Sequence, residues 1–180
     1  LTPRFVTDVR YADPVNGNDG WDGTMAVHKD GTDHGPKETL QGAFNVTTGN
    51  YPLVLAAAGV YSNGVTKIED LAGAPCLRRL VCRKAVGIRA VEGPDKTFLV
   101  GAPDSETGGL GVNAVAGVFM SGKSFFQGFT VTGCYTPTGT TKAYQDGAAF
   151  SGNTEAHILD CVASNNVAET DVARYVTALR

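Results

Sequence analysis

The chain has 180 residues, which is enough for one domain with a sizeable core. It carries 15 basic and 18 acidic side chains, and this near-neutral charge argues against a nucleic-acid-binding protein because such proteins need a basic face. Its 23 glycines, each costing about 0.5–1 kcal/mol inside a helix, argue against a helical bundle, and no apolar run approaches the ~20 residues of a membrane span.

The first 52 residues are expected to form the entry to the fold. Arg10–Ala12 predicts a short strand. The next segment, 13–23, is so rich in Asp, Asn and Gly that the backbone must turn repeatedly, and a polar stretch over 25–35 follows it. The region therefore begins with a strand and two loops.

A short helix and an apolar strand are expected next. Pro36 fits the first turn of a helix, and Leu40, Ala43 and Phe44 have the spacing of one apolar stripe. Residues 53–61 are apolar and end in a turn, which predicts a strand.

Residues 53–180 contain repeated segments that predict stacked β units. Three pairs are alike: Lys96–Gly101 with Lys123–Gly128, Ser121–Gly122 with Ser151–Gly152, and Phe126–Gly133 with Ile158–Asn165. Units of ~20–50 residues are too small to bury their own apolar side and become stable by stacking on their neighbours. A β-sandwich fits this pattern poorly because a whole unit repeats in the same direction.

Period-two alternation predicts which side chains face the core. Val86, Ile88 and Ala90 are expected to point inward, which leaves Arg89 outward. Cys161 is expected to fill the core. The four cysteines lack the paired C-x-x-C spacing of a zinc or redox site, and buried thiols are the expected state.

The last residues allow two interpretations. Val172, Tyr175, Val176 and Leu179 have helical spacing, which fits a terminal cap helix. Alternatively, 172–180 begins another unit. On that interpretation the chain stops within a unit and is a fragment of a longer protein, because stacked units need polar caps.

Several segments, taken in order, resemble the right-handed parallel β-helix proteins of the pectin-lyase-like superfamily. They are 11–24, Leu40–Ala43, Leu53–Tyr61, Gly128–Gly133 and Asp160–Asn166. The 25–35 stretch departs from the family by its length. The resemblance implies an all-β fold, a right-handed parallel β-helix (solenoid) with a short N-terminal capping helix, truncated at its C-terminal end. Residues 1–52 would be the entry part and 53–180 the parallel coils of a single domain.

The resemblance also implies a range of functions, because the superfamily contains polysaccharide lyases, glycoside hydrolases, epimerases, tailspikes and adhesins. We expect a secreted or cell-surface protein that binds or acts on polysaccharide or a cell-surface glycan, with its catalytic part outside this segment. The alternative is a non-catalytic adhesin or structural solenoid. No nucleic acid and no membrane span are expected, and no catalytic residues are assigned.

Two groups of metal-ligand side chains stand close together in the entry region. The first is a candidate for Ca²⁺, the one cofactor considered, and consists of Asp13, Asn16, Asn18, Asp19 and Asp22. Turn formation and side-chain caps explain the same residues. The second could hold a transition metal or be a solvated loop, and consists of His28, Asp30, Asp33 and His34.

Candidate substrate-binding residues are a cation and two aromatic side chains. They are Arg89, Tyr135 and Tyr144, with the tyrosines in the long loop 134–147. Arg89 belongs to a basic set with Arg78, Arg79, Arg83 and Lys84. The outward members of this set could bind acidic sugars, or the set could be the ordinary solvated face of a strand. His157 is expected on a strand surface.

Overall fold

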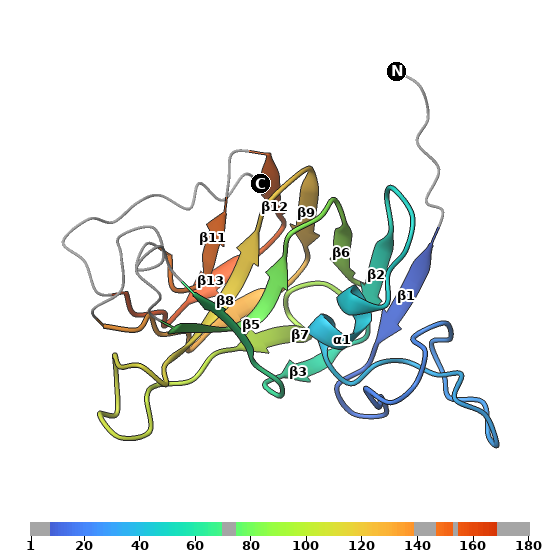
Figure 1. Ribbon diagram of the computed structural model, residues 1–180, viewed down its shortest axis with the longest axis horizontal. Helices are drawn as coiled ribbons and strands as arrows, with labels where there is room; N and C mark the ends of the chain where they lie inside the picture. The colour runs from blue at the N-terminus through green and yellow to red at the C-terminus, as the bar shows by residue number, and fades with distance from the viewer. Residues whose placement is uncertain (1–7, 70–74, 139–146, 153–154, 169–180) are drawn as a thin grey trace.

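The computed structural model describes residues 8–69, 75–138, 147–152 and 155–168, and their strands form three sheets (Figure 1). Sheet A contains, in spatial order, β1 (Val9–Ala12), β2 (Leu53–Ala56), β6 (Gly87–Ala90), β9 (Ser124–Gln127) and β12 (Ala156–Leu159). Sheet B contains β13 (Val162–Ser164), β10 (Thr130–Thr132), β7 (Thr97–Val100) and β3 (Gly59–Tyr61). Sheet C contains β11 (Phe150–Gly152), β8 (Val115–Met120), β5 (Pro75–Cys82) and β4 (Thr66–Glu69).

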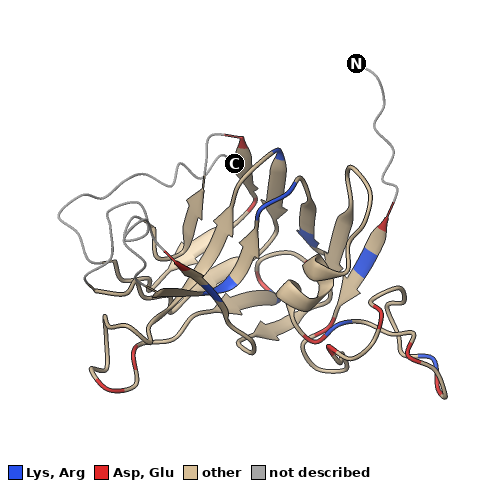
Figure 2. Ribbon diagram, viewed as in Figure 1, with Lys and Arg blue, Asp and Glu red and all other residues tan. Residues whose placement is uncertain are grey.

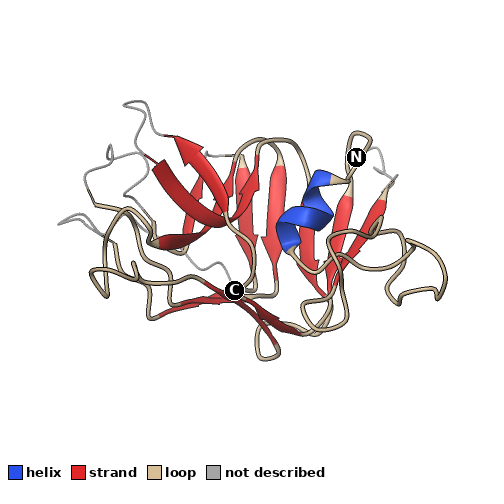
Figure 3. Ribbon diagram, turned by 60° about the horizontal axis from the view of Figure 1, so that its bottom comes forward, coloured by secondary structure: helices blue, strands red, loops and turns tan. Residues whose placement is uncertain are grey.

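The predicted fold class was wrong. The described residues form three separate, mostly parallel sheets, together with the helix α1 (Leu40–Asn45), and they show no closed solenoid (Figure 3). One pair breaks the expected regularity: β4 runs antiparallel to β5, with Ile68 opposite Cys76. Because the chain doubles back there, its units do not advance uniformly, and the right-handed parallel β-helix is replaced by a mostly-β arrangement of three sheets.

The strand pairing tests the three sequence repeats. The register of the last repeat is confirmed, because Phe126 pairs with Ile158 and Thr130 with Val162, in both cases 32 positions later. The first repeat is wrong, since β7 pairs with β3 and β10 in sheet B whereas β9 lies in sheet A. The second repeat is displaced by two positions, because Ser151 pairs with Phe119 and not with Ser121.

The corners between strands repeat with the same spacing. Gly128, between β9 and β10, has φ 79°, and Asp160, at the equivalent place between β12 and β13, has φ 48°. After the next strand, Gly133 has φ 60° and Asn165 has φ 53°. All four lie in the left-handed region, which Gly, Asn and Asp enter most readily. Equivalent corners keep equivalent strands in register.

The core lies between the sheets and is centred on aromatic rings. Phe126 of sheet A stacks on Phe129 at a centroid distance of 4.2 Å and meets Phe150 of sheet C edge-on at 5.9 Å. Tyr61 of sheet B contacts Phe129 at 6.4 Å. The predicted inward residues Val86, Ile88 and Ala90 are buried, and Arg89 is exposed. Cys161 packs against this core as expected, and the other three cysteines are buried, also as expected.

The helix is shorter than predicted. Its stripe of Leu40, Ala43 and Phe44 is buried as expected, but Thr39, not Pro36, marks its start. Thr39 Oγ1 accepts a hydrogen bond from the Gly42 amide, the usual role of an N-cap threonine. The predicted strand over 53–61 is two strands, β2 and β3. Residues 172–180, with their two interpretations, lie outside the described residues.

Candidate functional site

The outer face of sheet A gathers side chains from five strands that are far apart in sequence. The register places two outward-facing rows side by side across the sheet. One row is Val9, Leu53, Gly87, Phe125 and His157, and the other is Tyr11, Leu55, Arg89, Gln127 and Leu159. Neighbouring strands lie about 4.8 Å apart, so the face extends about 19 Å from β1 to β12. We call these ten residues the sheet A face.

A phenyl ring lies against the backbone at the middle of this face. A β-carbon added to Gly87 would lie 2.4 Å from Phe125 Cζ and 3.1 Å from Leu53 Cδ1. The Phe125 ring therefore occupies the space that any other residue at position 87 would fill. The absence of a side chain there lets the ring of one strand rest on the next strand, where it remains partly exposed to solvent.

A hollow of about 460 Å³ adjoins this ring. It is lined by Phe125 and by four polar residues of β9, β12 and the turns before them, namely Lys123, Ser124, Glu155 and His157. The hollow thus combines an aromatic wall with an amine, a carboxylate and an imidazole, whereas the Ser124 hydroxyl is buried and lies 3.3 Å from Gly122 O. Such a mixture is typical of sites that bind polar ligands with apolar faces.

Polar side chains complete the face beside the ring. Arg89 is exposed on β6 and lies next to Gln127 in register. Gln127 is oriented by its amide, whose Nε2 donates to Asp160 Oδ2 at 2.8 Å. Figure 2 shows basic residues on β6 and near the start of β9. The face therefore offers cations and a fixed amide around an apolar centre.

The predicted substrate-binding residues are not all brought together. Arg89 lies on the sheet A face, as its outward orientation required. Tyr135 is half-buried beyond sheet B, where its backbone N–H donates to Val115 O of β8 at 3.2 Å. Tyr144 lies outside the described residues. Alternation also placed His157 on a strand surface, which is confirmed. Sequence reasoning missed Phe125, although the alternation that buries Phe126 implies that Phe125 faces outward.

The first predicted metal group does not converge on one point. Asp13 accepts hydrogen bonds from the amides of Val15 and Asn16, and Asn18 Oδ1 accepts one from Gly20 N at 2.7 Å. Partial burial raises the pKa of the Asp13 carboxyl, but the amides of Asn16 and Val15 outweigh it and hold that pKa below its ordinary value. These side chains form turns, as the alternative interpretation expected.

Asp19 has a different structural role. Its carboxylate accepts hydrogen bonds from Thr39 N at 3.0 Å and from Thr39 Oγ1 at 2.6 Å. Because Thr39 is the N-cap of α1, Asp19 fixes the start of the helix against the entry loop. A β-carbon at Gly42 would meet the same carboxylate at 2.4 Å, so glycine is needed at this close approach.

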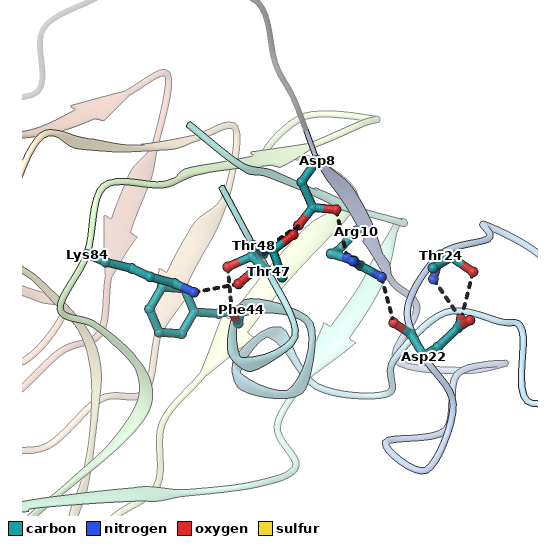
Figure 4. A network of polar contacts seen from close by, with 8 residues as sticks. All are labelled: Asp8, Arg10, Asp22, Thr24, Phe44, Thr47, Thr48 and Lys84. Atoms are coloured by element: carbon teal, nitrogen blue, oxygen red, sulfur yellow. Dashed lines mark hydrogen bonds and ion pairs between the residues drawn. The ribbon is translucent and has the colours of Figure 1, made fainter. Parts of the chain in front are cut away.

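Asp22 instead joins the second predicted group. Its Oδ1 accepts hydrogen bonds from Thr24 N and Thr24 Oγ1, as Figure 4 shows. Its Oδ2 lies 2.5 Å from His34 Nδ1. Donor atoms of Asp22, Asp33 and His34 all lie within 4.8 Å of one another. The structure thus combines one residue of the first group with two of the second.

The other basic residues of the predicted set are occupied structurally. Arg78 is fully buried, and Arg79 Nε donates to Val100 O at 2.7 Å. The Arg83 guanidinium lies 5.6 Å from the centre of the Phe119 ring. Lys84 Nζ donates to Thr47 O at 2.7 Å, a contact drawn in Figure 4. Of the predicted basic set, Arg89 is therefore the residue that lies on the sheet A face.

Comparisons with known proteins add no family to these observations. No family model, no curated protein and no solved structure matches the chain. The resemblance to the pectin-lyase-like superfamily therefore stays a prediction. In the part of the chain that the structure describes, no helix has the length and hydropathy needed to span a membrane.

Proposed function

We propose that the protein binds an extended polysaccharide, outside the cell or at its surface, across the sheet A face. The observation that carries this proposal is the Phe125 ring resting on Gly87 beside the hollow. An aromatic ring with one open face can stack on the apolar C–H face of a sugar, while nearby polar groups bind its hydroxyls.

The charges on the face favour an acidic glycan. Arg89 and Lys123 are both exposed. Arg89, on β6, is in register with Gln127, two positions after Phe125, and Lys123 lies in the turn before β9, two positions before Phe125. A guanidinium can bind a carboxylate or sulfate through two parallel hydrogen bonds. A sugar acid stacked on Phe125 would therefore have a cation within its reach on either side.

Cleavage of the bound glycan is a second candidate, and the hollow supplies the observation for it. Glu155 and His157 both line the space beside Phe125. A carboxyl group and an imidazole are the side chains that most often move protons in catalysis. If the protein is an enzyme, these two residues are the first to test.

The proposal is tested by titrating soluble polysaccharides, both uronate-containing and neutral, into the full chain in a calorimeter. The variant Phe125→Ala is expected to weaken binding of the best ligand about 5- to 30-fold, the effect of losing about 1–2 kcal/mol of stacking and burial. Phe98→Ala is the matched control, because Phe98 is also a half-buried, outward-facing strand residue but lies on sheet B.

Two results separate the candidate functions. New reducing ends or unsaturated products in the same mixtures would establish cleavage, and their loss in Glu155→Gln or His157→Gln would locate it. Binding without products would leave the non-catalytic role. Equal affinity of wild type, Phe125→Ala and Phe98→Ala, or no binding by the wild type, would refute the sheet A face as the glycan site.

A further inference from the structure

A second site is built into the entry loop, beside the edge strand β1 of sheet A. Two passes of the loop are joined by backbone hydrogen bonds from Asp22 N to Asp33 O and from Gly23 N to Gly35 O, both 2.9 Å long. This pairing brings residues more than ten positions apart next to each other. The loop is also tied to β1, because Tyr11 N donates to Gly23 O at 2.9 Å.

A stacked pair of rings stiffens this loop. The rings of Trp21 and His28 are parallel to within 3° at a centroid distance of 3.9 Å. The indole also lies against Gly35, where an added β-carbon would be 2.5 Å from Trp21 Cε3. The indole therefore contacts both a side chain and the backbone of the loop, and a side chain at position 35 would displace it.

The backbone of His34 is held from three directions. His34 N donates to Thr32 Oγ1 at 3.1 Å, and His34 O accepts a hydrogen bond from Lys29 N at 2.9 Å. His28 Nδ1 lies 3.2 Å from the same carbonyl oxygen. With its main chain fixed, the His34 ring presents Nδ1 to Asp22 Oδ2.

We propose that Asp22, Asp33 and His34 bind a first-row transition-metal dication such as Zn²⁺. One imidazole nitrogen and two carboxylates suit such an ion, whereas Ca²⁺ takes six to eight oxygen ligands. The donor atoms lie within 4.8 Å of one another, close enough to surround one ion. Water completes the coordination, since Asp33 and His34 are exposed.

The hydrogen bonds of Asp22 leave one oxygen for the ion. Thr24 occupies Oδ1 through its amide and hydroxyl, at 2.9 and 2.8 Å, and so orients the carboxylate with Oδ2 toward His34. Such outer hydrogen bonds are typical of metal ligands. Binding replaces the contact between Asp22 Oδ2 and His34 Nδ1: Nδ1 gives up its proton to solvent, the ring keeps a proton on Nε2 and stays neutral, and both contacting atoms become ligands.

The variant Asp33→Asn tests the site with little risk to the fold. The pairing of this loop segment uses the Asp33 backbone oxygen, which the substitution keeps, whereas Asp22→Asn would disturb the contacts with Thr24. Asp30→Asn is the matched control, because Asp30 is an exposed aspartate of the same loop outside the donor group.

Zn²⁺ is titrated into the full chain by calorimetry, and binding of Co²⁺ is followed by quenching of Trp21, the single tryptophan. We expect one ion per chain, affinity at least 10-fold weaker in Asp33→Asn, and unchanged affinity in Asp30→Asn. The proposal is overturned by the absence of binding at about 1 mM ion, by equal weakening in both variants, or by a cobalt–thiolate absorption band, which would place the ion on cysteine.

Discussion

The variant Gly87→Ala tests whether the position of the Phe125 ring matters for binding. The alanine β-carbon would lie 2.4 Å from Phe125 Cζ and 2.5 Å from Cε1, about 1 Å inside van der Waals contact. The backbone at Gly87 does not require a positive φ, so alanine is not strained there. The ring, whose outer side faces solvent, is expected to swing away from the sheet.

The expected change in the free energy of unfolding is small because two effects oppose each other. Lifting the ring exposes about 40 Å² of apolar surface, which costs about 1 kcal/mol. Replacing glycine by alanine removes freedom from the unfolded chain and returns about 0.4–1 kcal/mol. Unfolding in urea should therefore differ from wild type by less than about 1 kcal/mol.

Glycan affinity should fall much more than stability. If the sugar stacks on a ring held flat, Gly87→Ala should approach Phe125→Ala and lose about 5- to 30-fold in affinity. Calorimetric titration of the best polysaccharide ligand into the two variants measures this. If Gly87→Ala binds the glycan like wild type while Phe125→Ala does not, the ring contributes only apolar area. Its fixed position on Gly87 would then play no part in binding.

Two further predictions concern stability. The Tyr61 hydroxyl lies 2.9 Å from Ala12 O and 3.0 Å from Ala57 O, so its one proton is shared between two acceptors. Tyr61→Phe should lower the free energy of unfolding in urea by about 1 kcal/mol, and not by several, because Ala12 O keeps a hydrogen bond from Ala57 N. Amides of Asn113, Glu106 and Thr107 hold the pKa of Asp104 below its ordinary value of 3.8. This stabilisation is therefore present above pH 3.8 and is lost as the pH falls through the folded-state pKa. The stability difference between wild type and Asp104→Asn in urea should shrink from pH 7 to pH 3, and a constant difference would contradict this assignment.

The sequence predicted local features well because they depend on neighbouring residues. The alternation of Val86, Ile88 and Ala90 with Arg89 follows from the pleat of one strand. The helix stripe and the turn-forming role of Asp13 are equally local. Such features need no knowledge of which strand lies next to which.

The sequence did not predict features that depend on pairing between distant segments. Matching Lys96–Gly101 to Lys123–Gly128 joined strands of two different sheets, because short apolar strands that end in glycine look alike. The antiparallel β4–β5 pair was also missed, because alternation within a strand does not indicate which strand it pairs with or in which direction, and with the pair the departure from a regular solenoid was missed. Grouping metal ligands by sequence proximity likewise separated Asp22 from Asp33 and His34, which only the loop pairing brings together.

The outer face of sheet A differs from that of sheet B in the chemistry it offers to a ligand. The described strands of sheet B contain no charged residue, and their outward positions are small or apolar. Sheet A, by contrast, places Arg89 on β6 and His157 on β12, and Phe125 lies on the strand between them, in register with His157. An exposed cation contributes nothing to core packing, and a glycine beneath a ring weakens a strand. Folding stability alone does not favour this combination. Binding of a ligand that has an apolar face and carries an acidic group does favour it.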